Sequence, residues 1–103
     1  MELINAEEFD KVKNEALIID VRSEIEFRTL QTIDGSINIE INDLLSNFQY
    51  YVGDDKKRLI VTVCNAGNRS GQAATFLKQH DYNAKVLSGG IFGYKKKYQN
   101  NRL

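Results

Sequence analysis

Three short apolar runs constrain the fold of this chain more than any other feature. They are ALIID (residues 16–20), RLIVTVC (58–64) and AKVL (84–87). Continuous apolar runs of this length are typical of strands that are covered on both faces. Segments with helical patterning follow each run, so the connections cross over and the strands are parallel. The sequence therefore predicts an α/β fold: an open, mainly parallel sheet with helices on both faces.

The expected helices have recognisable starts. Asn5 with Glu8, and Ser23 with Glu26, both have the spacing of a capping box, in which each side chain bonds to the other residue's backbone amide. We expect helices over residues 5–13, 23–28, 43–51 and 70–80 and from about residue 91 onward, with a brief strand over 36–41.

The composition is that of one small globular domain. With 103 residues there is no room for a second core, so we expect a single domain over residues 1–103. A hydrophobic content of 42% with 27% charged residues is typical of a folded chain. Fourteen basic residues balance fourteen acidic ones, which argues against neutralisation of phosphates. We expect no nucleic-acid partner, and a solvated helix face for the lysine run 95–97.

Nothing in the sequence directs the chain to a membrane or an oxidising compartment. No apolar run approaches the roughly 20 residues that cross a bilayer. The first ten residues, MELINAEEFD, carry acids where a signal peptide has a basic and then an apolar segment. The single cysteine, Cys64, cannot form an internal disulfide. We therefore expect a cytoplasmic protein with no membrane partner.

Cys64 lies at the end of the second apolar run and begins the segment CNAGNRS (64–70). Ligands of parallel sheets bind beyond the carboxyl ends of the strands. A loop that leads from a strand into a helix can direct several backbone N–H groups at one centre, and the helix dipole lowers the pKa of a thiol there. Gly67 permits a left-handed turn, and Ser70 can cap the helix. Arg69 supplies a donor fork for a carboxylate or an anion.

A lone cysteine has a plainer interpretation, as a small buried hydrophobic residue. Composition alone favours that interpretation. The complete CNAGNRS segment at a junction between a strand and a helix favours a nucleophile instead, held in a cradle that binds an anion.

The chain resembles single-domain members of the rhodanese-like sulfurtransferase family over nearly its whole length. The catalytic loop of that family starts with Cys, has Gly three residues later and ends in Arg-Ser or Arg-Thr. Cys64, Gly67, Arg69 and Ser70 match it in order and spacing. Three further segments resemble the family in the same order: LIIDVRSEIEF (17–27), IDGSINI (33–39) and VLSGGIFGY (86–94), with Tyr94 where the family usually has Trp.

The resemblance implies a sulfur transfer in two steps, with Cys64 as the catalytic nucleophile. The thiolate takes the outer sulfur of a small donor, thiosulfate or a persulfide, and a thiol or cyanide then removes it. No metal or organic cofactor is required. The persulfide would lie in a cradle of N–H groups from Asn65, Ala66, Gly67, Asn68, Arg69 and Ser70. Asp20, Arg22 and Glu26 match family positions and are expected to support nearby loops through an ion pair and helix caps.

Departures from the family refine these expectations. Gln31 and Thr32 stand where the family often has Gly-His, so no role of that His at the site entrance is expected. His80 is expected to be a surface or capping residue and not a general base. The neutral loop residues Asn65, Ala66 and Asn68 suggest that the dianion thiosulfate is a poor donor and that a persulfide is the natural one.

The sequence is also compatible with other functions. Phosphatases and arsenate reductases with a related fold have five residues between Cys and Arg, whereas four separate Cys64 from Arg69, and the shorter loop favours a sulfur atom over a phosphate. A second hypothesis is a sulfur carrier that receives sulfur from one protein partner and passes it to another, with little turnover of small molecules. A third is a catalytically silent structural domain, which usually lacks the Cys.

Overall fold

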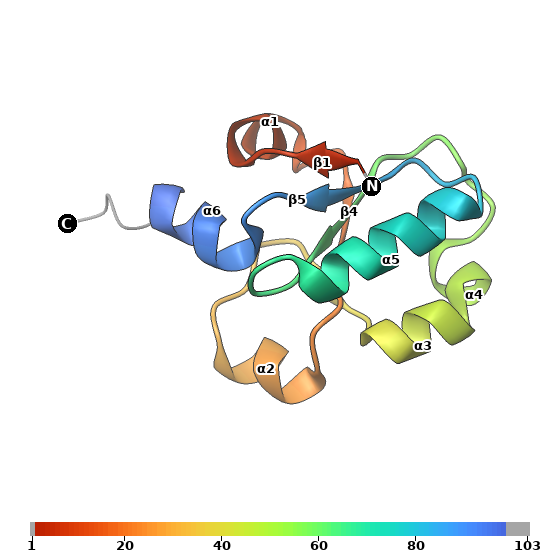
Figure 1. The fold of residues 1–103 in the computed structure, drawn as a ribbon, viewed down its shortest axis with the longest axis horizontal. Coiled ribbons are helices and arrows are strands. Elements are labelled where there is room, and N and C mark those ends of the chain that lie inside the picture. Colours follow the sequence, from red (N-terminus) through yellow and green to blue (C-terminus); the bar gives the residue numbers. More distant parts are fainter. Residues whose placement is uncertain (1, 99–103) are drawn as a thin grey trace.

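The three apolar runs form the centre of a five-stranded parallel sheet with the order β1-β5-β4-β2-β3. Figure 1 labels the first three of these strands, β1, β5 and β4. The structure is a computed structural model and describes residues 2–98. In the register of the two central strands, Leu17 pairs with Ile60 and Asp20 with Val63. The strands are β1 (Leu3–Ile4), β2 (Leu17–Asp20), β3 (Ile37–Asn38), β4 (Ile60–Val63) and β5 (Ala84–Leu87). The predicted parallel α/β fold is confirmed.

Helices connect the strands. They are α1 (Ala6–Val12), α2 (Glu24–Thr29), α3 (Ile41–Ser46), α4 (Phe48–Val52), α5 (Asn68–Gln79) and α6 (Gly90–Tyr98). Both predicted capping boxes are present, with Asn5 accepting from the Glu8 amide and Ser23 from the Glu26 amide. Among residues 2–98 no helix has the length and apolar character needed to cross a bilayer.

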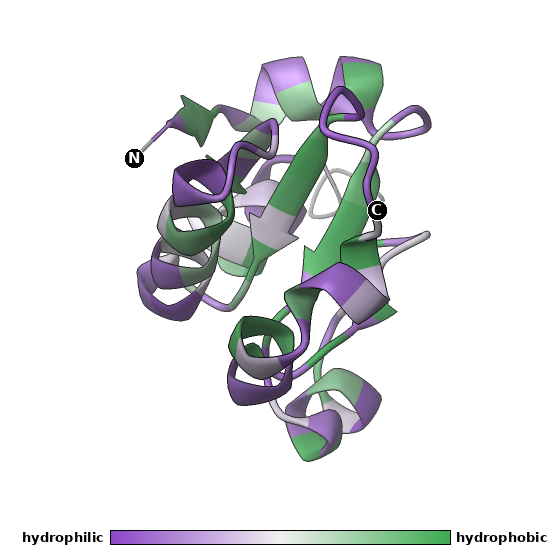
Figure 2. Ribbon diagram, turned by 90° about the vertical axis from the view of Figure 1, so that its right-hand side faces the viewer, coloured by the Kyte–Doolittle hydropathy of each residue, from purple (hydrophilic) through white to green (hydrophobic). Residues whose placement is uncertain are grey.

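The helices cover both faces of the sheet and bury two apolar clusters. On one face, Leu44 of α3 and Leu77 of α5 pack against the strands. On the other face, Phe9 of α1 and Ile91 of α6 do so. Figure 2 shows hydrophobic strands between helices that carry both hydrophilic and hydrophobic residues. Helix α2 buries none of its residues, and it stands apart from both clusters, next to the loop that follows β2.

Several predicted boundaries were wrong. The helix expected over 43–51 is two helices, since Asn47 leaves the helical conformation with φ −135° and ψ 37°. The strand expected over 36–41 is confined to β3, because the chain enters α3 at Ile41. The edge strand β1 was not predicted, since two residues carry no periodicity. The lysine run is only partly solvated, with Lys95 buried and Lys96 and Lys97 exposed.

Candidate active site

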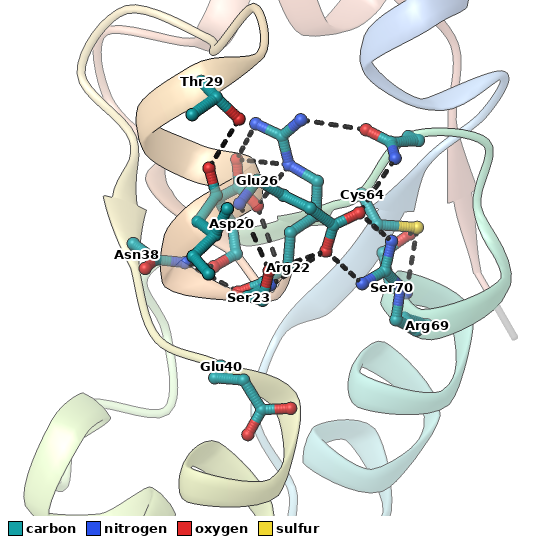
Figure 3. A network of polar contacts seen from close by, with 12 residues as sticks. Asp20, Arg22, Ser23, Glu26, Thr29, Asn38, Glu40, Cys64, Arg69 and Ser70 are labelled. Carbon is teal, nitrogen blue, oxygen red and sulfur yellow. Dashed lines mark hydrogen bonds and ion pairs between the residues drawn. The ribbon is translucent and has the colours of Figure 1, made fainter.

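The thiol of Cys64 lies directly after β4, where backbone and side-chain donors converge on it (Figure 3). Only 2% of the residue is exposed. Its Sγ accepts the N–H of Gly67 at 3.1 Å and the N–H of Ser70 at 3.4 Å. The Ser70 hydroxyl lies 3.2 Å from the same sulfur. The thiol therefore borders the apolar core but faces polar groups that favour an anion.

These contacts determine the pKa of the thiol. Burial raises the pKa of Cys64, because it penalises the charged form. The Ser70 hydroxyl and the amides of Ser70, Gly67 and Ala66 lower it, and together they outweigh burial. The net result is a pKa of Cys64 below its ordinary value. The geometry thus enriches the thiolate, which is the nucleophilic form of cysteine.

Ser70 has a different position from the one predicted. It was expected to cap the helix, but α5 begins two residues earlier, at Asn68, with Gly67 as the N-cap. Gly67 has φ 122°, a conformation that side chains disfavour. Ser70 is consequently buried in the first turn of α5, with its hydroxyl on the sulfur. Its carbonyl accepts the hydroxyl of Thr62 at 2.8 Å, a contact to β4 that sequence analysis missed.

We predict that Ser70→Ala moves the reactivity of Cys64 to higher pH. The variant removes the hydroxyl that most strongly lowers the pKa of this thiol, so the thiolate forms at higher pH. Alkylation with iodoacetamide, followed against pH, should show a higher midpoint and a slower rate at neutral pH. The control Ser46→Ala, at an exposed position in α3, should leave the profile unchanged. An unshifted midpoint in Ser70→Ala would contradict the prediction.

The first residues of helix α6 hold the loop that begins at Cys64 through two backbone hydrogen bonds. The amide of Ile91 donates to the carbonyl of Cys64 at 2.9 Å, and that of Phe92 to the carbonyl of Asn65 at 3.2 Å. In a trans peptide the N–H points away from the C=O, so capture of the Asn65 carbonyl turns the Ala66 amide toward the sulfur. Gly90 makes this approach possible, because a Cβ there would lie 2.4 Å from the Asn65 oxygen. The Gly-Gly pair in VLSGGIFGY marks this position in the sequence, but it does not indicate the contact with Asn65.

Arg69 pairs with Glu26 of α2. Its two terminal nitrogens donate to the two carboxylate oxygens at 2.7 and 3.0 Å. Arg69, and then the Ser23 amide, lower the pKa of Glu26 to about 2, so the pair is charged at neutral pH. The guanidinium is thus neutralised by a carboxylate, and it ties α2 to the first turn of α5.

A buried ion pair supports the loop from the end of β2. Asp20 and Arg22 are both fully buried, and the guanidinium bonds to both carboxylate oxygens at 2.7–3.1 Å. Arg22 also donates to the side-chain oxygen of Asn65 at 2.8 Å, and the Asn65 amide nitrogen donates to Glu26 at 3.2 Å. One further Arg22 bond reaches the carbonyl of Gln31. This network extends continuously from Asp20 to Arg69.

The structure brings all the predicted site residues together near the carboxyl ends of β2 and β4, but they differ in whether they face the sulfur. Amides of Ala66, Gly67 and Ser70 face the sulfur, whereas the side chains of Asn65 and Arg69 belong to the network just described. Asn68 is exposed at the start of α5. His80 lies away from this loop at the end of α5, as predicted, with its Nδ1 2.9 Å from the Phe76 carbonyl. Within residues 2–98 no cluster of His, Cys, Asp or Glu has the arrangement to hold a metal ion.

The chain is similar to known proteins in sequence and in fold. The rhodanese-like domain family matches residues 5–97. A rhodanese-related protein from Thermoplasma volcanium is 28% identical and superposes with a TM-score of 0.84, covering 95% of this chain and 94% of that one. CoADR-RHD from Bacillus anthracis is 28% identical, with a TM-score of 0.80 over 92% of this chain and 16% of that much longer one.

A third similarity concerns the fold alone. A Rhodopseudomonas palustris protein of unknown function, described as a possible tyrosine phosphatase, is 17% identical, with a TM-score of 0.81 over 94% of this chain and 81% of that one. No curated protein matches the chain.

Proposed function

Because the chain belongs to the rhodanese-like domain family, we propose that it is a sulfurtransferase that moves a sulfane sulfur from a donor to a thiophilic acceptor through a persulfide on Cys64. The observation that carries this proposal is the convergence of the Gly67 and Ser70 amides and the Ser70 hydroxyl on Sγ. These donors stabilise negative charge on the attacking thiolate and on the persulfide that replaces it.

In the first step, the Cys64 thiolate attacks the outer sulfur of the donor. A sulfur–sulfur bond forms at Cys64 while the bond inside the donor breaks, and the electron pair leaves on the donor's inner group. That group is sulfite when the donor is thiosulfate, and a thiolate when it is a persulfide. In the second step, an acceptor thiolate or cyanide attacks the outer sulfur of the persulfide, and the electron pair returns to Cys64. No net oxidation or reduction of the protein occurs.

The electrostatics of the loop favour a persulfide donor over thiosulfate. Asn65, Ala66 and Asn68 are neutral, and the Arg69 cation is paired with Glu26. The dianion thiosulfate therefore lacks the free cation that would offset its desolvation.

We predict that kcat/KM with thiosulfate is at least about tenfold lower than with a small alkyl persulfide. A tenfold difference corresponds to the free energy of roughly one charge-assisted hydrogen bond, which thiosulfate lacks here. Steady-state rates with cyanide as the acceptor would measure this. Ala66→Lys, which adds a cation at an exposed loop position, should raise the rate with thiosulfate more than the rate with the persulfide. Faster turnover with thiosulfate than with the persulfide in the unmodified protein would refute the prediction.

One observation favours a second candidate function. Because the Arg69 cation is already paired with Glu26, a small anionic donor gains no ionic partner at the cradle, whereas a persulfidated partner protein would gain its affinity from contacts outside the cradle. In such a sulfur carrier, small donors would give negligible turnover, whereas a persulfidated partner would load Cys64 readily. Mass spectrometry after incubation with small donors distinguishes the two, since a gain of one sulfur atom favours the enzyme.

A further inference from the structure

A groove of about 560 Å³ runs along one side of α5, beginning at the cradle loop. Leu45 of α3 lines it opposite α5, and Figure 1 shows these two helices side by side. Gly67 belongs both to the groove and to the set of donors on the Cys64 sulfur. The lining residues are Leu45, Gly67, Asn68, Gly71, Gln72, Thr75, Phe76 and Gln79.

The groove is elongated, and its near end is lined by Gly67 of the cradle. The lining positions 68, 71, 72, 75, 76 and 79 recur every three or four residues, so they form one face of α5. From Gly67 to Gln79 this face extends roughly 18 Å at about 1.5 Å per residue. At Gly67, an added Cβ would meet no atom within 4 Å, so the space above this cradle residue is free.

The chemistry of the lining is neutral. None of the lining side chains is ionisable, and polar groups come from the amides of Asn68, Gln72 and Gln79 and the hydroxyl of Thr75. Leu45 and Phe76 supply apolar surface. A charged ligand would lose hydration here without gaining an ionic partner. An uncharged chain that alternates amide and methylene groups would find donors, acceptors and apolar contacts along the whole groove.

We propose that this groove binds the uncharged, amide-containing arm of a small thiol whose sulfur end lies at the cradle. The inference rests on the proposed function, because it names the class of persulfide that loads Cys64. With the arm along α5, the Cys64 thiolate attacks the outer sulfur of R–S–SH. The new bond forms Cys64–S–SH, and the electron pair leaves as R–S⁻, which takes a proton from solvent.

The first test compares donors that differ in their arms. Pantetheine persulfide carries a neutral chain with amides, whereas glutathione persulfide carries carboxylates and an ammonium group. The second-order rate of Cys64 persulfidation should be about tenfold higher with the pantetheine persulfide, equivalent to one or two neutral hydrogen bonds. Equal rates, or a preference for glutathione persulfide, would overturn the proposal.

A matched pair of variants locates the effect. Gln72→Trp fills the groove from an exposed position on α5, and Gln49→Trp makes the same change at an exposed position on α4. The rate with pantetheine persulfide should fall about tenfold in Gln72→Trp and stay within about twofold in Gln49→Trp. The rate with thiosulfate, which has no arm, should stay within about twofold in both variants. Equal losses with both donors would show a general disturbance of the site and overturn the proposal.

A binding measurement separates the groove from the reaction. S-methylated pantetheine cannot transfer sulfur, and its titration should shift the NMR signals of the side-chain amides of Gln72 and Gln79 while leaving that of Gln49 in place. Persulfidation of Cys64 without these shifts would refute ligand binding in the groove but would remain consistent with the proposed sulfurtransferase activity. If these shifts occur but no donor persulfidates Cys64, the proposed sulfurtransferase activity would be refuted, and the groove would remain a binding site.

Discussion

Cys64→Ser is expected to abolish sulfur transfer. Incubation of the unmodified protein with a persulfide should add the mass of one sulfur atom to Cys64, and the variant should show no such gain. Turnover should fall at least about a thousandfold, because removal of the nucleophile removes the covalent intermediate. The serine hydroxyl can use the same donors from Gly67 and Ser70, so the thermal midpoint should change little. A mass gain retained in the variant would refute the role of Cys64.

A relocated thiol tests the cradle itself. The double variant Cys64→Ser with Ser46→Cys keeps one cysteine but moves it to an exposed position on α3. That thiol lacks the converging amides, so its pKa stays ordinary and its persulfide is unprotected. We expect no turnover above the level of a free thiol. Recovery of activity in this variant would mean that the loop geometry is irrelevant to the chemistry.

Asp20→Asn should have the largest effect on stability. Asp20 and Arg22 are both fully buried, and the substitution leaves the guanidinium without its counter-charge. Breaking a buried ion pair from one side costs about 3–5 kcal/mol, which is a large part of the roughly 5–15 kcal/mol that holds a small domain folded. Chemical denaturation should show this loss. Asp34→Asn makes the same change in an exposed turn and should leave the unfolding free energy unchanged.

A double variant separates stability from positioning. Asp20→Leu with Arg22→Met replaces the pair by apolar side chains, which is often neutral for stability. The variant still lacks the Arg22 donor that holds the Asn65 side chain. We expect unfolding free energy close to that of the unmodified protein but slower persulfidation of Cys64. Full activity in this stable variant would show that the ion pair serves the fold alone.

Much of the fold was predictable because its signals are local. The apolar run at 58–64 can be recognised without knowing which strands pair with it, and it contains β4 at the centre of the sheet. The two capping boxes depend on side chains three residues apart, and both are present. The position of Cys64 between a strand and a helix was also visible, since a strand pattern ends there and a helix pattern follows.

The rest depends on tertiary contacts that no local pattern encodes. Glu26 was expected to serve in an ion pair or a helix cap near the site, but no local pattern identified Arg69 as its partner, because the two residues are 43 positions apart in the sequence. Ser70 looked like a helix cap, but the φ of Gly67 starts α5 earlier and turns the hydroxyl to the sulfur. Gly90 belonged to a segment that resembles the family, and only the structure reveals the backbone of Asn65 against it.

The contacts of α6 have a consequence for biosynthesis. Every strand within residues 2–98 has ended by Leu87, whereas the amides that donate to the carbonyls of Cys64 and Asn65 come from Ile91 and Phe92. A growing polypeptide can therefore assemble its sheet before its reactive centre acquires its final shape, because the N-terminal parts of a domain emerge first. The loop that begins at Cys64 therefore receives its last backbone hydrogen bonds only after the first residues of α6 have been added to the chain.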